Sequence, residues 1–411
     1  MRPTTTDPPV SDPRIFYGWF VVAGAFAVTF VGFGSAYSFS AFLIPLQHDF
    51  AASRGSVSLV FSLAGFLYFG LGVVTGPLAD RWGAKGLAVA GMVLIGIGLA
   101  AASMARSLGA VYLAYGLGVG LGIGCSYVPA IAAVQRWFVR RRGFASGLAV
   151  SGIGVGTLVV PPIASLLIGT LGWRETYLAF GAFSAVAGAG MAVLIEDDPR
   201  RRGLAPDGDA AGSTIPASGS AEAVLAKVLT SRRFVGLYAA CFICSFGLFV
   251  PFVHLVPYAL DHGVAQSAAV LLVGAIGVGS TAGRFLLGGV ADRLGRPLSF
   301  LLMFVGMGLS FVIWFFSVSL WPLALFALAY GVFYGGFVAL APAVVIDYFG
   351  GRHVSSLIGI LYTSVAFGAL IGPSAAGFAF DVSRSYTLPI LISVGAYAVA
   401  SAVLAVTSRA T

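Results

Sequence analysis

The chain has 411 residues, of which 59% are hydrophobic and only 9% charged, and its mean hydropathy is +0.97. A soluble domain carries roughly 25% charged residues, so this composition excludes an ordinary soluble protein and predicts a chain embedded in lipid. The net charge of +8 does not indicate a nucleic-acid partner, because the Lys and Arg residues are scattered in short loops instead of gathered on one face.

Twelve apolar runs are long enough to cross a membrane. A bilayer core about 30 Å thick needs about 20 apolar residues in a helix, since unpaired backbone polar groups cannot be left in hydrocarbon. The first 15 residues precede these runs, and we expect 1–15 to form a disordered cytoplasmic tail. The runs cover residues 17–46, 56–79, 86–104, 108–135, 143–169, 174–195, 233–260, 267–291, 297–317, 321–347, 354–380 and 386–406.

The basic residues predict the orientation of these helices. Most of the 23 Lys and Arg residues fall in alternate short loops, and cytoplasmic loops are the ones enriched in positive charge. This pattern predicts that both termini lie in the cytoplasm. We expect the protein in the plasma membrane, which is the inner membrane of a bacterium. Arg284 is the exception, because it lies inside a predicted span.

Residues 196–231 interrupt the pattern between the sixth and seventh runs. They are rich in charge, Gly, Ser and Pro, which is typical of a linker between domains, here on the cytoplasmic side. Apolar residues recur at helical spacing toward its end and predict a short amphipathic helix. This helix either lies on the inner membrane surface or packs against the helical bundle. The residues concerned are Ala221, Val224, Leu225, Val228 and Leu229.

An internal repeat divides the chain into two halves. The segment from Gly76 to Gly83 reappears from Gly288 to Gly295, so that Asp80 and Asp292 stand 212 residues apart. Trp137 and Phe349, and also Pro161 and Pro373, keep the same offset. A constant offset over distant landmarks indicates a duplicated unit. We therefore expect an all-α polytopic membrane protein with six-helix bundles at 16–195 and 232–406, and a second cytoplasmic tail at 407–411.

The two repeated loops are candidates for a gate. Asp80 follows the second span and faces the basic loop that begins at Arg136, so our hypothesis is a switchable ion pair that holds the inner side shut, with Asp292 doing the same in the second half. The alternative is that these loops are only turns and determinants of topology. The candidate gating residues are Gly76, Asp80, Arg81, Gly83, Arg136, Gly288, Asp292, Arg293 and Gly295.

These repeated loops resemble the signature loop of the major facilitator superfamily. Within that superfamily the chain is similar to the monocarboxylate transporter family and its bacterial relatives over nearly its whole length. The similarity rests on Gly18-Trp19-Phe20-Val21-Val22 with Gly24 and Phe26, Pro129, Trp137-Phe138 with Arg141, Arg142, Ala145 and Gly147, Gly172-Trp173-Arg174, Gly247 and Pro251, Gly283-Arg284 with Gly288, and Gly372-Pro373.

The resemblance implies twelve helices, alternating access and the movement of small carboxylates, commonly together with protons. It also implies that Arg284 is the carboxylate anchor. Two departures concern the proton pathway. Many animal members carry an Asp one turn before this Arg and a Lys in the first helix, whereas this chain has Ser280 and an uncharged residue near Tyr37. The family's proton relay therefore does not carry over.

Arg284 is the candidate substrate anchor on physical grounds as well. A charged side chain inside a span costs roughly 3 kcal/mol, so an intramembrane Arg either has a function or extends its charge toward the inner surface. Its planar donors suit both oxygens of one carboxylate, and one fixed cation favours a monoanion. His254 is the nearest further basic candidate, as a proton carrier, a substrate ligand or a satisfied core residue.

Other polar side chains are expected to line the same cavity. In the superfamily fold this cavity is lined by the first, fourth, seventh and tenth helices, and Tyr362 of the eleventh is a further candidate. Each tyrosine is either a ligand for a small organic acid or a packing residue. The candidates besides Arg284 and His254 are Tyr37, Ser126, Tyr127, Tyr330, Tyr334 and Tyr362.

The sequence contains no nucleotide-binding loop and no cluster of metal ligands, so we expect neither an enzyme nor a cofactor. Its predicted function is secondary transport of small monocarboxylates such as lactate or pyruvate by proton symport, with the substrate, protons and the lipid bilayer as partners. Two alternatives remain open. One is exchange or uniport of another organic anion such as oxalate or formate, and the other is a membrane receptor that does not transport.

Overall fold

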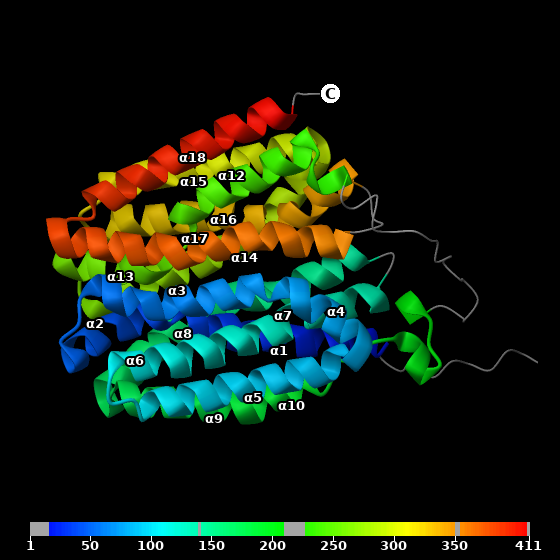
Figure 1. Ribbon diagram of the computed structural model, residues 1–411, viewed down its shortest axis with the longest axis horizontal. Helices are drawn as coiled ribbons and strands as arrows, with labels where there is room; N and C mark the ends of the chain where they lie inside the picture. Colours follow the sequence, from blue (N-terminus) through cyan, green and yellow to red (C-terminus); the bar gives the residue numbers. More distant parts are fainter. Residues whose placement is uncertain (1–15, 139–140, 209–226, 350–353, 409–411) are drawn as a thin grey trace, which may run out of the picture.

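The computed structural model describes residues 16–138, 141–208, 227–349 and 354–408. Within these ranges all regular secondary structure is helical, and the helices lie roughly along one direction in two groups (Figure 1). The predicted tails 1–15 and 409–411 lie outside the described residues, as do Ala221, Val224 and Leu225 of the predicted amphipathic helix. Residues 227–229, at the end of that predicted helix, are helical.

The first half follows the six predicted runs, with some of them divided. Two π-helical turns, η1 (Tyr112–Leu117) and η2 (Ser184–Gly188), interrupt the fourth and sixth runs. The α-helices are α1 (Gly18–Tyr37), α2 (Phe39–Phe50), α3 (Arg54–Gly70), α4 (Gly72–Trp82), α5 (Ala84–Ser103), α6 (Leu108–Val111), α7 (Gly118–Trp137), α8 (Arg142–Leu171), α9 (Trp173–Phe183) and α10 (Ala189–Ala192).

The second half also follows its six predicted runs. Only its first run is divided, at Phe249, just as the first run of the first half is divided at Ser38. The linker begins with two 3-10 turns, η3 (Pro199–Arg202) and η4 (Pro206–Gly208). The helices are α12 (Arg232–Leu248), α13 (Val250–Asp261), α14 (Gln266–Leu294), α15 (Arg296–Phe315), α16 (Leu320–Phe349), α17 (Val354–Ser383) and α18 (Thr387–Ser408).

Most of these segments meet the requirements of a membrane span. In the described part of the chain, 10 helices are long and apolar enough to cross a membrane. Helices α3 and α4 are bent by 43° at the break between them, and counting this pair as one span gives up to 11. The remaining predicted span, 174–195, corresponds to α9, η2 and α10. The prediction of an all-α polytopic membrane protein is therefore confirmed.

The backbone reproduces the repeat. Helix α8 begins at Arg142 and α17 at Val354, and they end at Leu171 and Ser383, so both bounds keep the offset of 212 residues. Gly83 before α5 has φ 87° and ψ 144°, and Gly295 before α15 has φ 85° and ψ 139°. Glycine adopts positive φ without steric cost, which explains why this residue stands at both turns.

The two halves meet along two helix pairs. Helix α3 packs along α17, and α8 packs along α14. Glycines bring these helices close together, since a Cβ on Gly377 would meet the backbone of Gly55 at 2.7 Å and one on Gly154 would meet the backbone of Gly277 at 3.0 Å. Figure 1 shows α3 in blue next to α17 in orange. We call the end where α10 leads into the linker the linker end, and the opposite end the outer end.

Candidate functional site

Arg284 lies on α14 and is 6% exposed. One face of α14 packs tightly on α16, because its glycines allow the two backbones to approach: a Cβ on Gly279 or Gly283 would collide with the backbone near Val332. The guanidinium reaches the first half of the chain instead. Its Nη1 donates to the carbonyl oxygen of Val150 in α8 at 3.1 Å. Arg284 therefore bridges the two halves.

The other edge of this guanidinium has no partner. The Nε and Nη2 atoms of Arg284 are buried without a hydrogen bond, and the guanidinium forms no ion pair with any acidic side chain that the structure describes. A buried cation without a counterion is costly, and unmade hydrogen bonds add to that cost. Nε and Nη2 lie on the same side of the planar group, so this edge can hold the two oxygens of one carboxylate.

Four of the predicted tyrosines lie within electrostatic reach of this cation. Tyr334 of α16, Tyr127 of α7, Tyr37 of α1 and Tyr362 of α17 all interact electrostatically with Arg284. The first three are at most 9% exposed. The structure thus brings together five of the eight residues predicted to bind substrate, from five different spans and both halves.

An aromatic contact between the halves joins this group. The hydroxyls of Tyr37 and Tyr334 lie 3.0 Å apart and share a hydrogen bond. Phe252 of α13 stacks on Tyr37 with 4.3 Å between ring centroids and contacts Tyr334 edge-on at 5.2 Å. Such ring contacts contribute about 1 kcal/mol each beyond the area they bury. They hold α1 of the first half against α13 and α16 of the second.

Ser126 and Tyr330 make their hydrogen bonds inside their own halves, although the ring of Tyr330 stacks on that of Tyr334 with 6.1 Å between centroids. The hydroxyl of Ser126 donates to Gly122 in its own helix at 2.8 Å, and its side chain packs beside Gly91 of α5. The hydroxyl of Tyr330 donates to the carbonyl of Leu248 at 2.5 Å. Since these partners satisfy both hydroxyls, the geometry favours packing roles for the two residues.

His254 belongs to a separate polar group at the outer end. Its Nδ1 lies 3.0 Å from the hydroxyl of Tyr386, and its Nε2 lies 2.8 Å from the carbonyl of Pro373. The hydroxyl of Tyr386 also accepts a hydrogen bond from Arg54 at 3.0 Å. We call Arg54, His254, Asp261, Asp381 and Tyr386 the outer latch. Arg54 is the first residue of α3 and only 8% exposed.

The predicted gating residues lie at the linker end. Arg81 and Arg293 are exposed, and the turn glycines Gly83 and Gly295 directly precede α5 and α15. The side chains of Asp80 and Asp292 lie outside what the structure describes, as does the surrounding of Gly288, so the predicted ion pairs stay a hypothesis. Gly76 lies within α4, and Arg136 shares a hollow of about 290 Å³ with Ala79, Gly83, Asp197, Asp198 and Arg201.

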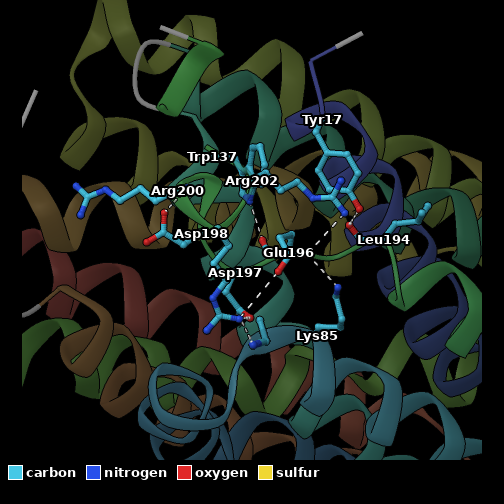
Figure 2. Close-up of polar contacts among 11 residues, drawn as sticks. Tyr17, Lys85, Trp137, Leu194, Glu196, Asp197, Asp198, Arg200 and Arg202 are labelled. Carbon is cyan, nitrogen blue, oxygen red and sulfur yellow. Dashed lines mark hydrogen bonds and ion pairs between the residues drawn. The ribbon is translucent and has the colours of Figure 1, made fainter. Parts of the chain in front are cut away.

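The start of the linker is bound to the first half at this end (Figure 2). The carboxylate of Glu196 lies 3.0 Å from Nζ of Lys85 and 3.8 Å from Arg202. The backbone carbonyl of Glu196 accepts a hydrogen bond from the indole of Trp137 at 2.7 Å. Arg202 covers the ring of Tyr17 at 3.5 Å. We call residues 194–202 with these contacts the linker clasp, which joins the ends of α1, α5 and α7.

Asp197 completes the linker clasp by capping a helix. Its carboxylate accepts the backbone N–H of Ala84, the first residue of α5, and lies 3.4 Å from Arg201. A carboxylate at a helix N-terminus is favourable because free N–H groups and the helix dipole meet it. Sequence reasoning assigned Glu196 and Asp197 to the linker and missed this capping role. The usable signals were an acidic pair directly after a span and the glycine turn before α5.

In the second half the corresponding helix ends are joined directly. Arg296, the first residue of α15, lies 2.7 Å from Asp347 near the end of α16. Both side chains are well exposed, at 40% and 35%. The described ion pairs of the linker end thus stay within one half, whereas the pair formed by Arg54 and Asp261 joins the two halves at the outer end.

Comparison with known proteins agrees with this architecture. The sequence matches the Major Facilitator Superfamily over residues 24–295 and 235–410, so the protein is a transporter of that superfamily. Its fold is similar to that of a bacterial homologue of the human lysosomal transporter Spinster, crystallised in an inward-facing and unoccupied conformation. The TM-score is 0.75 at 15% identity, and the match covers 97% of this chain and 98% of the other.

Curated relatives narrow the assignment. Human monocarboxylate transporter 11 is 30% identical over 397 residues, which cover 94% of this chain and 82% of the relative. Rat monocarboxylate transporter 3 is 30% identical over 400 residues, which cover 95% and 80%. The chain therefore belongs to the monocarboxylate transporter family, and it is an integral membrane protein and not an enzyme.

Proposed function

We propose that this protein carries small monocarboxylates such as lactate or pyruvate across the membrane, together with protons, by alternating access. The observation that supports this most directly is the free edge of Arg284, whose Nε and Nη2 are buried without partners. An anion bound there would neutralise the cation and complete its hydrogen bonds. The names of the relatives point to the same class of substrate.

The surroundings of Arg284 favour one carboxylate over two. The second cation that a dicarboxylate would need is His254, but its ring nitrogens are engaged in the outer latch with Tyr386 and Pro373. The polar groups that interact electrostatically with Arg284 are the hydroxyls of Tyr37, Tyr127, Tyr334 and Tyr362. Phenols can donate to or accept from a hydroxyl or keto group next to a carboxylate.

Among the side chains that the structure describes, no acidic group pairs with Arg284, so proton coupling has to work without one. In the described spans the acidic groups of the second half lie at helix ends, as Asp261, Asp347 and Asp381 do. We therefore propose that the proton crosses with the substrate at Arg284, which avoids carrying an uncompensated charge through the membrane. We further propose that the linker end faces the cytoplasm of the plasma membrane, the inner membrane in a bacterium.

Uptake into proteoliposomes tests this proposal. Labelled lactate, pyruvate, acetate and oxalate are offered with and without an inward proton gradient, to wild type, to Arg284→Ala and to Arg106→Ala, which removes an exposed arginine. We expect gradient-stimulated uptake of the monocarboxylates, retained in Arg106→Ala and reduced at least about 100-fold in Arg284→Ala. Uptake unaffected by Arg284→Ala would exclude the anchor. Uptake driven by internal anion without a proton gradient would establish an exchanger instead.

A further inference from the structure

The outer latch ties the two halves together through Arg54. Its Nη1 and Nη2 donate to the two carboxylate oxygens of Asp261 at 2.6 and 2.7 Å. Asp381 accepts the backbone N–H groups of Arg54 and Gly55, both at 2.9 Å, and thereby caps α3. Arg54 belongs to the first half and both carboxylates to the second. These bonds must therefore break whenever the halves separate at the outer end.

A directed chain of hydrogen bonds leads from Arg54 to His254. The guanidinium of Arg54 can only donate, so the hydroxyl oxygen of Tyr386 accepts at 3.0 Å. The carbonyl of Pro373 can only accept, so Nε2 of His254 carries a hydrogen and donates at 2.8 Å. The hydroxyl of Tyr386 therefore donates its hydrogen to Nδ1 of His254, which lies 3.0 Å away and accepts it. This arrangement uses the neutral imidazole.

A protonated His254 does not fit this chain. Its Nδ1–H would point at the oxygen of Tyr386, which already accepts from Arg54, so two cations would share one acceptor in a site where His254 is 0% exposed. The two carboxylates do not compensate, because Asp261 holds the guanidinium of Arg54 and Asp381 holds the N-terminus of α3. Other titratable groups at the outer end include Tyr112, which bonds to Ser56, Tyr258 and His262, which contact each other, Asp49, which pairs with Arg174, and the exposed His48 and Glu175.

We propose that the outer latch is a pH-sensitive gate, which closes only with neutral His254 and takes up a proton on that residue when it opens. The sign follows from linkage: the open state binds the additional proton, so a lower external pH favours the outward-open state. Closure expels this proton to the side from which it came. The latch is thus a sensor of external pH, separate from the proton that crosses with substrate, and its operation does not depend on the identity of the substrate.

The expected effect on the ratio of open to closed molecules is large, because imidazole in water takes up its proton at about pH 6.5. If His254 titrates in this range when the gate is open and stays neutral when it is closed, acidification from about pH 7.5 to 5.5 multiplies the ratio of open to closed molecules by about ten.

Distances between spin labels at the outer end test the gate without any substrate. Labels on Met104→Cys and Phe316→Cys suit this purpose, because these residues are 80% and 76% exposed at equivalent positions of the two halves, in a background with Cys125, Cys241 and Cys244 replaced by Ala. We expect the long-distance population to rise about tenfold in its ratio to the short one between pH 7.5 and 5.5. An unchanged distribution in the labelled protein would by itself overturn the proposal.

Two histidine variants locate the sensor. His254→Gln keeps a donor and an acceptor but does not titrate, and we expect its open fraction to be independent of pH. His262→Gln removes an exposed histidine of the same end and is expected to respond like the parent protein. A pH response that persists in His254→Gln, or one that disappears in His262→Gln alone, would refute the assignment of His254. Arg54→Gln is expected to raise the open fraction at every pH, and a closed gate in this variant would contradict the latch.

Discussion

Two buried arginines of this protein have opposite surroundings. Arg54, 8% exposed, has both its Nη atoms on the carboxylate of Asp261 and its guanidinium 4.0 Å from the centre of the Phe380 ring. Arg284, 6% exposed, has one backbone acceptor and two unpaired donors, Nε and Nη2. A guanidinium that already holds a carboxylate can fasten parts of the protein together. One without a carboxylate remains available for an anionic ligand.

The largest expected effect concerns the unpaired arginine. Arg284→Lys keeps the positive charge but replaces the planar fork by a single ammonium group, so one of two charged hydrogen bonds to a carboxylate is lost. We expect kcat/KM for monocarboxylate uptake to fall about 10- to 100-fold. Initial uptake rates over a range of substrate concentrations measure this, with Arg106→Lys as the control. An unchanged kcat/KM would mean that charge alone, and not the fork, acts at this site.

The paired arginine is expected to act on conformation. Arg54→Gln and Asp261→Asn should each raise the ratio of outward-open to closed molecules about tenfold, a moderate value because the side chain of Asp261 is 34% exposed. The double variant should add little, since both changes remove the same ion pair. Label distances at the outer end report this ratio. Arg174→Gln is the control, because Arg174 pairs with Asp49 at 2.7 Å within the first half. Additive effects would show that the pair does not act as a unit.

The tyrosine pair between the halves should have a smaller effect. Tyr37→Phe removes one hydroxyl and leaves that of Tyr334 without its 3.0 Å partner, which costs about 1 kcal/mol. We expect the KM for the monocarboxylate to change about fivefold. Tyr330→Phe serves as the control, since its hydroxyl bonds to Leu248 within the second half and should affect thermal stability but not KM. Equal changes of KM in both variants would remove the distinction between the two tyrosines.

The linker clasp should matter least for transport. Glu196→Gln weakens the contacts with Lys85 and Arg202, but the backbone bond from Trp137 persists. We expect the midpoint of thermal unfolding to fall by about 1 to 2 °C, with KM unchanged. Glu175→Gln, an exposed acidic residue, provides the comparison in the same thermal unfolding assay. A marked rise in KM for Glu196→Gln would connect the linker clasp with the substrate site.

The candidate site was only partly predictable. Arg284 stood out because it is a charge within an apolar run, and the superfamily pattern of helices suggested Tyr37, Tyr127 and Tyr334. The same reasoning grouped His254, Ser126 and Tyr330 with them, since position along a span does not tell which side of the helix faces the partner half. His254 lies in the outer latch, and the hydroxyls of the other two are satisfied within their own halves.

The sequence by itself determined the membrane location, the all-helical architecture and the duplication of a six-helix unit. The lengths of the apolar runs and the constant offset between repeated residues can be read from the sequence without knowledge of the fold. Only the tertiary structure decided which distant groups meet. Arg54 and Asp261 are 207 residues apart, and Glu196 and Trp137 are 59 apart. Such pairs depend on how α3 packs on α17 and how the linker returns to the first half, and no periodic pattern in the sequence encodes those contacts.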